Sequence, residues 1–289
     1  MFPDLYEDDH DLRDALRARG AEVDAVRWDD EAADWASYDL VVLRSPWDYT
    51  ERHGEFIAWT RTVPRLANPA AVVEWNTDKR YLSELAAAGL PVTPTSFVAP
   101  GDDWAVPPVG EWVVKPTISA SSRDTGRYDL PAQAALFTAH VRRLTDGGRT
   151  AMIQPYLSAV DTAGETSVLL TPDAAGLLTF SHGVRKGPIL TGPDEQKPHS
   201  DYTEEISPRA PTDDELALAA HAVTLVPGGA EQLLYARVDV LPGPDGAPVL
   251  LELELTEPSL FLRTAPHAAA RLAEAILHRL HRVRPSSSG

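Results

Sequence analysis

The chain has 289 residues, of which 43% are hydrophobic and 24% charged, as is typical of a globular protein with two or three small domains. Its formal net charge of −17 argues against a general nucleic-acid-binding role, because phosphate backbones need a basic face. The absence of cysteine excludes disulfides, thiolate metal sites and thiol nucleophiles. The sequence contains no membrane-spanning apolar run and no signal peptide, so we expect a cytoplasmic protein.

The first part of the chain, residues 1–72, is predicted to form a small α/β domain with a parallel sheet, because strands and helices alternate along it. The expected elements are an acidic loop at 4–11, a helix at 11–20, strands at 21–28 and 39–44, and a helix at 55–63. Arg44, Trp47 and Asp48 follow the second strand and are candidate substrate contacts. For Trp47, packing between domains is an equal alternative.

The next part, residues 73–153, carries two lysines that could bind phosphate. A helix is expected at 77–89, strands at 95–98, 111–115 and 151–155, and another helix at 130–144. Lys79 lies in the first turn of the first helix, where the helix dipole opposes a cation unless a ligand compensates it; a solvated lysine beside Asp78 is the alternative. Lys115 closes a strand.

A loop of small residues follows Lys115 directly, and its members are Ser119, Ala120, Ser121 and Ser122. Exposed backbone N–H groups and hydroxyls in such a loop can surround phosphate oxygens, with the lysine as a point charge. The loop is not a Walker loop, because Gly-x-x-x-x-Gly-Lys does not occur. A small-residue loop of purely structural role is the alternative.

Several polar residues on the last part of the chain, 154–289, are further candidates. A possible hinge that contacts a purine consists of Gln154, Pro155, Tyr156 and Leu157, and Glu165 on the next strand could accept from a ribose hydroxyl. Arg185 and Lys186 follow the strand expected at 177–184, and either cation could neutralise a phosphoryl group or a substrate carboxylate. Surface ion pairs are the alternative.

Two strands near the C-terminus, at 234–241 and 249–255, are expected to pair across a Pro-Gly-Pro-Asp-Gly turn. Because side chains alternate along a strand, Glu252 and Glu254 share one face, and the leucines at 251, 253 and 255 share the other. Asp239 on the partner strand adds a third carboxylate, and Arg237 shares its face. Three carboxylates suit a hard divalent cation such as Mg²⁺; an exposed hairpin with solvated charges is the alternative.

The remaining elements include a helix at 213–226 capped by Thr212 and a last helix at 265–283. The polar stretch 187–211 is expected either to form part of a lid or to be disordered, and residues 285–289 to be a frayed tail.

The order of these features along the chain resembles the ATP-grasp superfamily. The resemblance implies an α/β (α+β) fold in which two subdomains, 73–153 and 154–289, clamp ATP. It also implies two Mg²⁺ ions held by Asp239, Glu252 and Glu254. Glu254 stands where the family usually has asparagine, but a carboxylate is also an oxygen ligand.

Four segments resemble more narrowly an actinobacterial group that contains the cycloserine-forming O-ureido-serine cyclo-ligase. They are Arg-Ser-Pro-Trp-Asp-Tyr at 44–49, Asn-Pro at 68–69, Trp-Asn-Thr-Asp-Lys-Arg-Tyr at 75–81 and Glu-Pro-Ser-Leu-Phe at 257–261. Members of that group normally begin with a hydrophobic strand before the acidic loop. We therefore expect either a misassigned start codon or an N-terminal sheet that lacks its first strand.

These features predict an ATP-dependent ligase that activates a small, amino-acid-like carboxylate as an acyl phosphate for attack by an amine. Arg185 or Arg237 would stabilise the tetrahedral oxyanion. One alternative is an intramolecular cyclo-ligase with a single substrate. Another is a nucleotide-binding protein that has lost catalysis, which the missing strand favours and the intact carboxylates oppose. The resemblance also implies a homodimer in some members, although the sequence identifies no interface.

Overall fold

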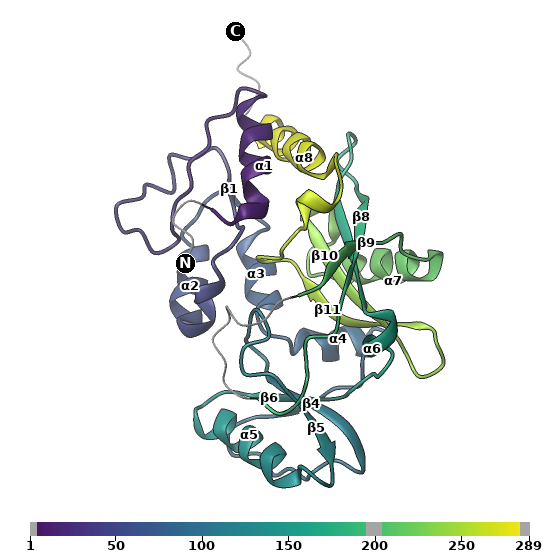
Figure 1. Cartoon of the computed structure of the whole chain (residues 1–289). Coiled ribbons are helices and arrows are strands. Elements are labelled where there is room, and N and C mark those ends of the chain that lie inside the picture. The colour runs from purple at the N-terminus through teal and green to yellow at the C-terminus, as the bar shows by residue number, and fades with distance from the viewer. Residues whose placement is uncertain (1–4, 195–203, 284–289) are drawn as a thin grey trace.

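The computed structural model describes residues 5–194 and 204–283, which form three β-sheets flanked by helices (Figure 1). In chain order the elements are α1 (Glu7–Arg17), β1 (Val41–Val42), α2 (His53–Thr60), β2 (Leu66–Ala67), α3 (Ala70–Asn76), α4 (Tyr81–Ala87), β3 (Ser96–Val98), β4 (Gly110–Pro116), β5 (Gly126–Leu130), α5 (Ala134–Asp146), β6 (Ala151–Pro155), α6 (Val160–Ala163), β7 (Glu165–Pro172), β8 (Leu178–Lys186), β9 (Ile206–Pro208), α7 (Asp213–Thr224), β10 (Ala236–Pro242), β11 (Pro248–Glu254) and α8 (Ala268–Val283). The predicted mixed α/β class is confirmed. The expected tail at 285–289 and part of the 187–211 stretch lie outside the described residues.

The N-terminal region contains a small parallel sheet, β1–β2, and its first helix packs against the last helix, α8 (Figure 1). Helix α1 begins at Glu7, inside the segment that was expected to be an acidic loop. Its first turn carries Glu7, Asp8 and Asp9, and negative side chains there are stabilised by the partial positive charge of the helix N-terminus. The acidic run therefore starts the helix instead of preceding it.

The prediction of a strand at residues 21–28 is wrong, because this segment pairs with no strand among the described residues. A groove of about 940 Å³ is lined both by this segment and by β1. A strand requires a neighbouring backbone that accepts and donates ladder hydrogen bonds, and an alternating sequence does not supply that neighbour.

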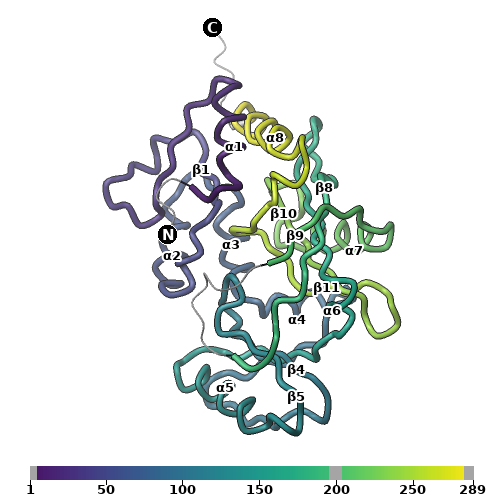
Figure 2. Tube along the Cα trace, viewed as in Figure 1, coloured from purple at the N-terminus to yellow at the C-terminus, as the bar shows by residue number. Residues whose placement is uncertain are grey.

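The central part of the chain forms an antiparallel sheet of order β3-β6-β4-β5, with α5 packed against it. In the trace of Figure 2 this part lies at the bottom, and the five-stranded sheet lies above it.

Several elements of this part differ from those expected. Strand β5 was not predicted, and the helix expected at 130–144 begins only at Ala134, after Pro131. The helix expected at 77–89 is confirmed only as α4, which begins at Tyr81; the preceding helix, α3, was not predicted, and Lys79 lies in the turn between the two. The Lys79 N–H donates to the carbonyl of Thr117 at 3.0 Å.

The C-terminal part forms an antiparallel sheet of order β11-β10-β7-β8-β9 between two helices. One apolar cluster joins Leu218 and Ala222 of α7 to Val238 and Leu253 of the sheet. A second cluster joins α8 to the same sheet and to the N-terminal region. The predicted cap of α7 is confirmed, because Thr212 Oγ1 accepts from the N–H of Glu215 at 3.2 Å. None of the helices in the described part is long and apolar enough to cross a membrane.

The stability of the central sheet is expected to depend on pH through His140 of α5. Its ring is buried, and its Nδ1 lies 2.7 Å from the hydroxyl of Tyr128. Burial, helped by nearby Arg143, lowers the pKa of His140 to about 4. A depressed pKa means that the unfolded chain takes up the proton first, so stability falls as pH decreases from about 6.5 towards 4.

We expect urea unfolding to show a loss of about 2–3 kcal/mol from this one group across that window, as the pKa difference implies. The variant His140→Gln removes the titration, so its stability should decline less between the same pH values. An equal decline in both proteins would contradict this prediction.

Candidate functional site

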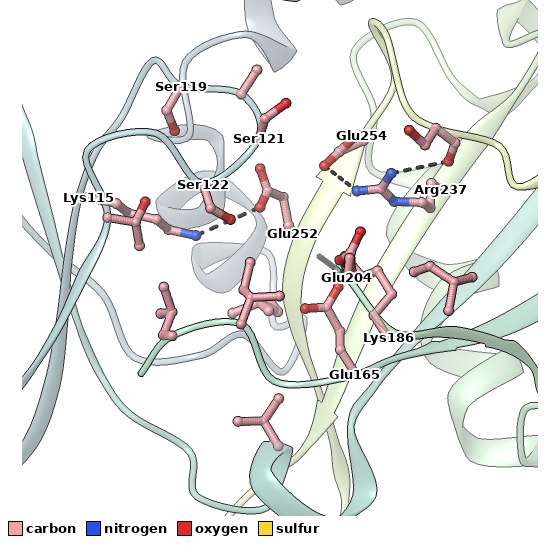
Figure 3. A pocket seen from close by; sticks show the side chains of 18 of the residues that line it. Lys115, Ser119, Ser121, Ser122, Glu165, Lys186, Glu204, Arg237, Glu252 and Glu254 are labelled. Atoms are coloured by element: carbon pink, nitrogen blue, oxygen red, sulfur yellow. Dashed lines mark hydrogen bonds and ion pairs between the residues drawn. The ribbon is translucent and has the colours of Figure 1, made fainter. Parts of the chain in front are cut away.

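A cavity of about 730 Å³ lies between the four-stranded and five-stranded sheets and reaches the N-terminal region. Most of the residues predicted to bind nucleotide, metal or substrate line it. They are Trp47, Lys79, Lys115, Ser119, Ala120, Ser121, Ser122, Gln154, Pro155, Tyr156, Leu157, Glu165, Lys186, Arg237, Glu252 and Glu254. In Figure 3, Lys115 and the serines lie on one side, Arg237, Glu254, Lys186 and Glu165 on the other, and Glu252 between them.

Two buried lysines meet at Glu252. Lys79 Nζ lies 2.9 Å from Glu252 Oε1 and donates to the carbonyl of Ser119 at 2.8 Å, while Lys115 Nζ lies 3.7 Å from Glu252 Oε2. Burial raises the pKa of Glu252, but the two lysines outweigh it and lower the pKa to about 2. Burial lowers the pKa of Lys115. Two lysine ammonium groups thus share one carboxylate on this side of the cavity, which leaves an excess of positive charge there.

The loop after β4 lines the cavity with Ser119, Ala120, Ser121 and Ser122. Ser121 and Ser122 have φ values of 56° and 54°, in the left-handed region that residues other than glycine rarely adopt. Small side chains in such a loop leave its backbone N–H groups accessible to an anion. Strained backbone of this kind is concentrated at functional sites.

A second cluster of charges surrounds Asp239, which is 1% exposed. Its carboxylate accepts from Arg237 Nη2 at 2.9 Å and lies 3.2 Å from Lys186 Nζ. Arg237 also pairs with Glu254, and Lys186 with Glu165. Burial raises the pKa of Glu254 to about 7 and that of Glu165 to about 8, although each has a cation beside it. Both carboxylates therefore need a further positive charge to ionise fully.

The acidic residues are not arranged as a closed metal cage. Within the described ranges, no group of three or more histidine, aspartate or glutamate side chains is placed to hold a metal ion. Asp239 does not line the cavity, and its oxygens already accept from Arg237, Lys186 and Ser167. Glu252 and Glu254 do line it, from one face of β11, as predicted from strand alternation.

A bulge changes the other face of β11. The pairing register of β10 and β11 shifts between Asp239 and Val240, so that Asp239 lies opposite Glu252 but Val240 lies opposite Leu250. The additional residue, Leu251, is half-buried and lines the cavity, whereas Leu250 is fully buried in the core and Leu253 belongs to the core and also reaches the cavity. The prediction that Leu251 shares one face with Leu253 and Leu255 is therefore wrong at this bulge, and Leu251 offers an apolar surface to the cavity.

Three predicted residues lie away from the cavity. Arg185 precedes Lys186 on β8, so alternation turns it to the opposite face, where its Nε donates to the carbonyl of Ala163 at 2.8 Å. Arg44 is buried, pairs with Asp9 at 2.7 Å and donates to the carbonyl of Pro258 at 3.2 Å. Asp48 lines the groove beside β1 instead. The role of Arg185 as an oxyanion contact and those of Arg44 and Asp48 as substrate contacts have no geometric support.

Sequence reasoning missed two residues of the site, Glu257 and Tyr49. Glu257 is 9% exposed, lines the cavity and accepts a hydrogen bond from the hydroxyl of Tyr49. Burial, and next Glu254, raises the pKa of Glu257 to about 8. The signal that could have found Glu257 was its place three residues after Glu254, as the one charged residue of the segment 255–262.

The chain is similar in sequence and structure to known ligases. Residues 1–68 match the family model "D-cycloserine synthetase DcsG, N-terminal domain". The cycloserine biosynthesis protein DcsG of Streptomyces lavendulae is 38% identical over 286 residues, which cover 93% of this chain and 92% of that protein. The crystal structure of D-cycloserine synthetase DcsG superposes with a TM-score of 0.81 at 36% identity, covering 95% of this chain and 94% of that one.

More distant structures share the fold alone. The ATP-grasp ligase PsnB, solved with a variant of its minimal precursor, Mg and ADP, superposes with a TM-score of 0.59 at 20% identity, covering 96% of each chain. The ATP-grasp fold predicted from the order of the lysines and carboxylates is thereby confirmed. The identity to DcsG over nearly the whole chain shows that this protein belongs to the DcsG family of ADP-forming ATP-grasp ligases.

Proposed function

We propose that the protein uses ATP and Mg²⁺ to phosphorylate the carboxylate of a small, amino-acid-like substrate, so that an amine displaces the phosphate. The observation that carries this proposal is the cavity itself. It brings two lysines, a loop of small residues and two carboxylates from one strand face together in a space of about 730 Å³. Phosphoryl transfer depends on positioning and on charge neutralisation, so such a set needs no covalent nucleophile.

The two sides of the cavity suit the two ends of a nucleotide. Lys79 and Lys115 would hold the α- and β-phosphates, and the backbone of loop 119–122 the γ-phosphate. The adenine would lie against the hinge at 154–157 and the apolar side chain of Leu251, with the ribose near Glu165. The hinge is held in place, since the guanidinium of Arg127 lies 3.6 Å from the ring centre of Tyr156.

The residues present fit Mg²⁺, because this ion usually takes one or two protein carboxylates and shares the rest of its ligands with phosphate. Glu252 and Glu254 would hold it; bound Mg²⁺ would neutralise charge on the phosphates during transfer. We keep the prediction of two ions, one for each carboxylate. Asp239 could bind Mg²⁺ only by giving up its contacts with Arg237 and Lys186. Its proposed role is instead to hold these two side chains in position. Arg237 is the proposed oxyanion contact.

The similarity to DcsG favours a second candidate, an intramolecular cyclo-ligase with one substrate that carries both the carboxylate and the attacking nitrogen. We further propose that the chain divides into domains 1–72, 73–153 and 154–289. We also propose a cytoplasmic location, where ATP and Mg²⁺ are available, and a homodimer. Size-exclusion chromatography with light scattering measures the last of these.

ADP release tests the proposed function. The protein, ATP and Mg²⁺ are mixed with each proteinogenic amino acid in both enantiomeric forms and with O-ureido-serine, with and without hydroxylamine. We expect one or a few acids to release ADP and to give a hydroxamate when hydroxylamine traps the acyl phosphate. ADP release from O-ureido-serine alone, without an added amine, would identify the cyclo-ligase. Tight ATP binding with no ADP release from any acid would instead indicate a catalytically inactive nucleotide-binding protein.

A further inference from the structure

The carboxylates that line the cavity are compensated in different ways. Five of them form an ion pair with a lysine or arginine, and they are Glu7, Glu165, Glu204, Glu252 and Glu254. A sixth, Asp8, accepts from the backbone N–H groups of Leu262 and Arg263 at 3.0 and 3.1 Å. Glu257 has neither kind of partner among the described residues; the hydroxyl of Tyr49 is its hydrogen-bond donor.

The carboxyl group of Glu257 is buried close to two other carboxylates, those of Glu254 and Glu252. Glu257 is 9% exposed, and both Glu254 and Glu252 disfavour its ionisation. Burying an ionised carboxylate without a cation costs free energy. Such a group either stays protonated or ionises when a positively charged ligand binds beside it. A single neutral hydroxyl does not meet the need of an ionised carboxylate. Glu257 is therefore a cavity carboxylate that a positively charged ligand would stabilise.

The position of Glu257 is fixed by the N-terminal region. The indole Nε1 of Trp47 donates to the carbonyl of Glu257 at 3.1 Å. Arg44 donates to the carbonyl of the next residue, Pro258, at 3.2 Å. Tyr49 is 3% exposed and stacks on Phe56 with ring centres 4.8 Å apart, so its hydroxyl has little freedom to move. A carboxylate held at both its backbone and its side chain is preorganised for one ligand geometry.

We propose that Glu257 binds the ammonium group of the substrate amino acid, and that Tyr49 positions Glu257 for this contact. An ammonium carries three N–H donors and one positive charge, so it can supply both the hydrogen bonds and the charge that a buried carboxylate needs. This inference rests on the proposed function and narrows its substrate class to acids with a free amino group near the carboxylate.

The test uses the acid that releases ADP fastest and the analogue that lacks its amino group. With the native protein we expect kcat/KM to be about 100-fold higher for the amino acid, in line with a buried, charge-assisted hydrogen bond. In Glu257→Gln this ratio should fall below about 10, mainly because KM for the amino acid rises. The KM for ATP should change less than about threefold, since the nucleotide contacts remain.

Two further variants separate binding from folding. Glu55→Gln makes the same chemical change at an exposed carboxylate outside the cavity and should leave the ratio as in the native protein. Tyr49→Phe should raise KM for the amino acid about fivefold and leave the analogue unaffected, as expected for loss of one hydrogen bond, and it serves as the test if Glu257→Gln does not fold.

An unchanged ratio in Glu257→Gln, or in Tyr49→Phe an equal loss with both acids, would overturn the inference and leave the proposed function intact. No ADP release by the native protein with any acid would overturn the proposed function itself.

Discussion

Replacing both Glu252 and Glu254 by glutamine is expected to weaken Mg²⁺-dependent ATP binding at least about 100-fold, since it removes both carboxylates that line the cavity from β11. Metal-free ATP should behave differently. Lys79 and Lys115 lose Glu252 as their carboxylate partner, so they are free to attract phosphate, and metal-free binding should not weaken. The ratio of the two affinities is therefore the quantity that changes most.

Isothermal calorimetry with ATP, in the presence of Mg²⁺ and in the presence of a chelator, measures this ratio. The matched control is Glu55→Gln/Glu274→Gln, which removes the same number of charges from two exposed positions. The control should retain the native ratio. A double variant at Glu252 and Glu254 whose affinity still depends on Mg²⁺ as strongly as that of the native protein would exclude these residues as ligands of the ion.

Replacing Asn68 by alanine is expected to lower the free energy of unfolding by about 3–5 kcal/mol, because three buried hydrogen bonds are lost together. The Asn68 amide donates to the carbonyls of Tyr235 and Leu255 at 3.0 and 2.7 Å, and its oxygen accepts from the N–H of Leu234 at 2.6 Å. The side chain is fully buried, so water cannot take its place. It joins the end of β2 to the segments that precede β10 and follow β11.

Urea unfolding followed by tryptophan fluorescence gives the change in free energy. Gln232→Ala is the matched control: the Gln232 amide also donates to two backbone carbonyls, of Pro227 and Gly229, but its side chain is half-buried at the end of a short 3₁₀ helix. Because water can replace these contacts, the control should lose less than about 1 kcal/mol. Similar losses in both variants would show that the three contacts of Asn68 contribute no more than an ordinary surface contact.

The sequence alone determined the parts of the site that depend on local periodicity and local chemistry. Alternation along one strand placed Glu252 and Glu254 on a common face, and the structure has both in the cavity. Thr212 before the segment 213–226 predicted a capped helix, and the cap is present as part of a capping box. The order of the lysines and carboxylates also identified the ATP-grasp fold. Each of these inferences needed only neighbouring residues or their order along the chain.

Tertiary structure decided the features that depend on distant partners. Lys79 lies in a turn because its N–H is bound by Thr117, and Leu251 faces the cavity because β10 imposes a bulge on β11. Arg185 faces away while Lys186 faces in, and only the register of β8 against β7 fixes which of the two does so. Glu257 is recognised only in the folded structure, where the other glutamates that line the cavity form ion pairs with lysine or arginine and Glu257, among the described residues, does not. Long-range contacts such as these leave no periodic signal in the sequence, because the partner lies far along the chain.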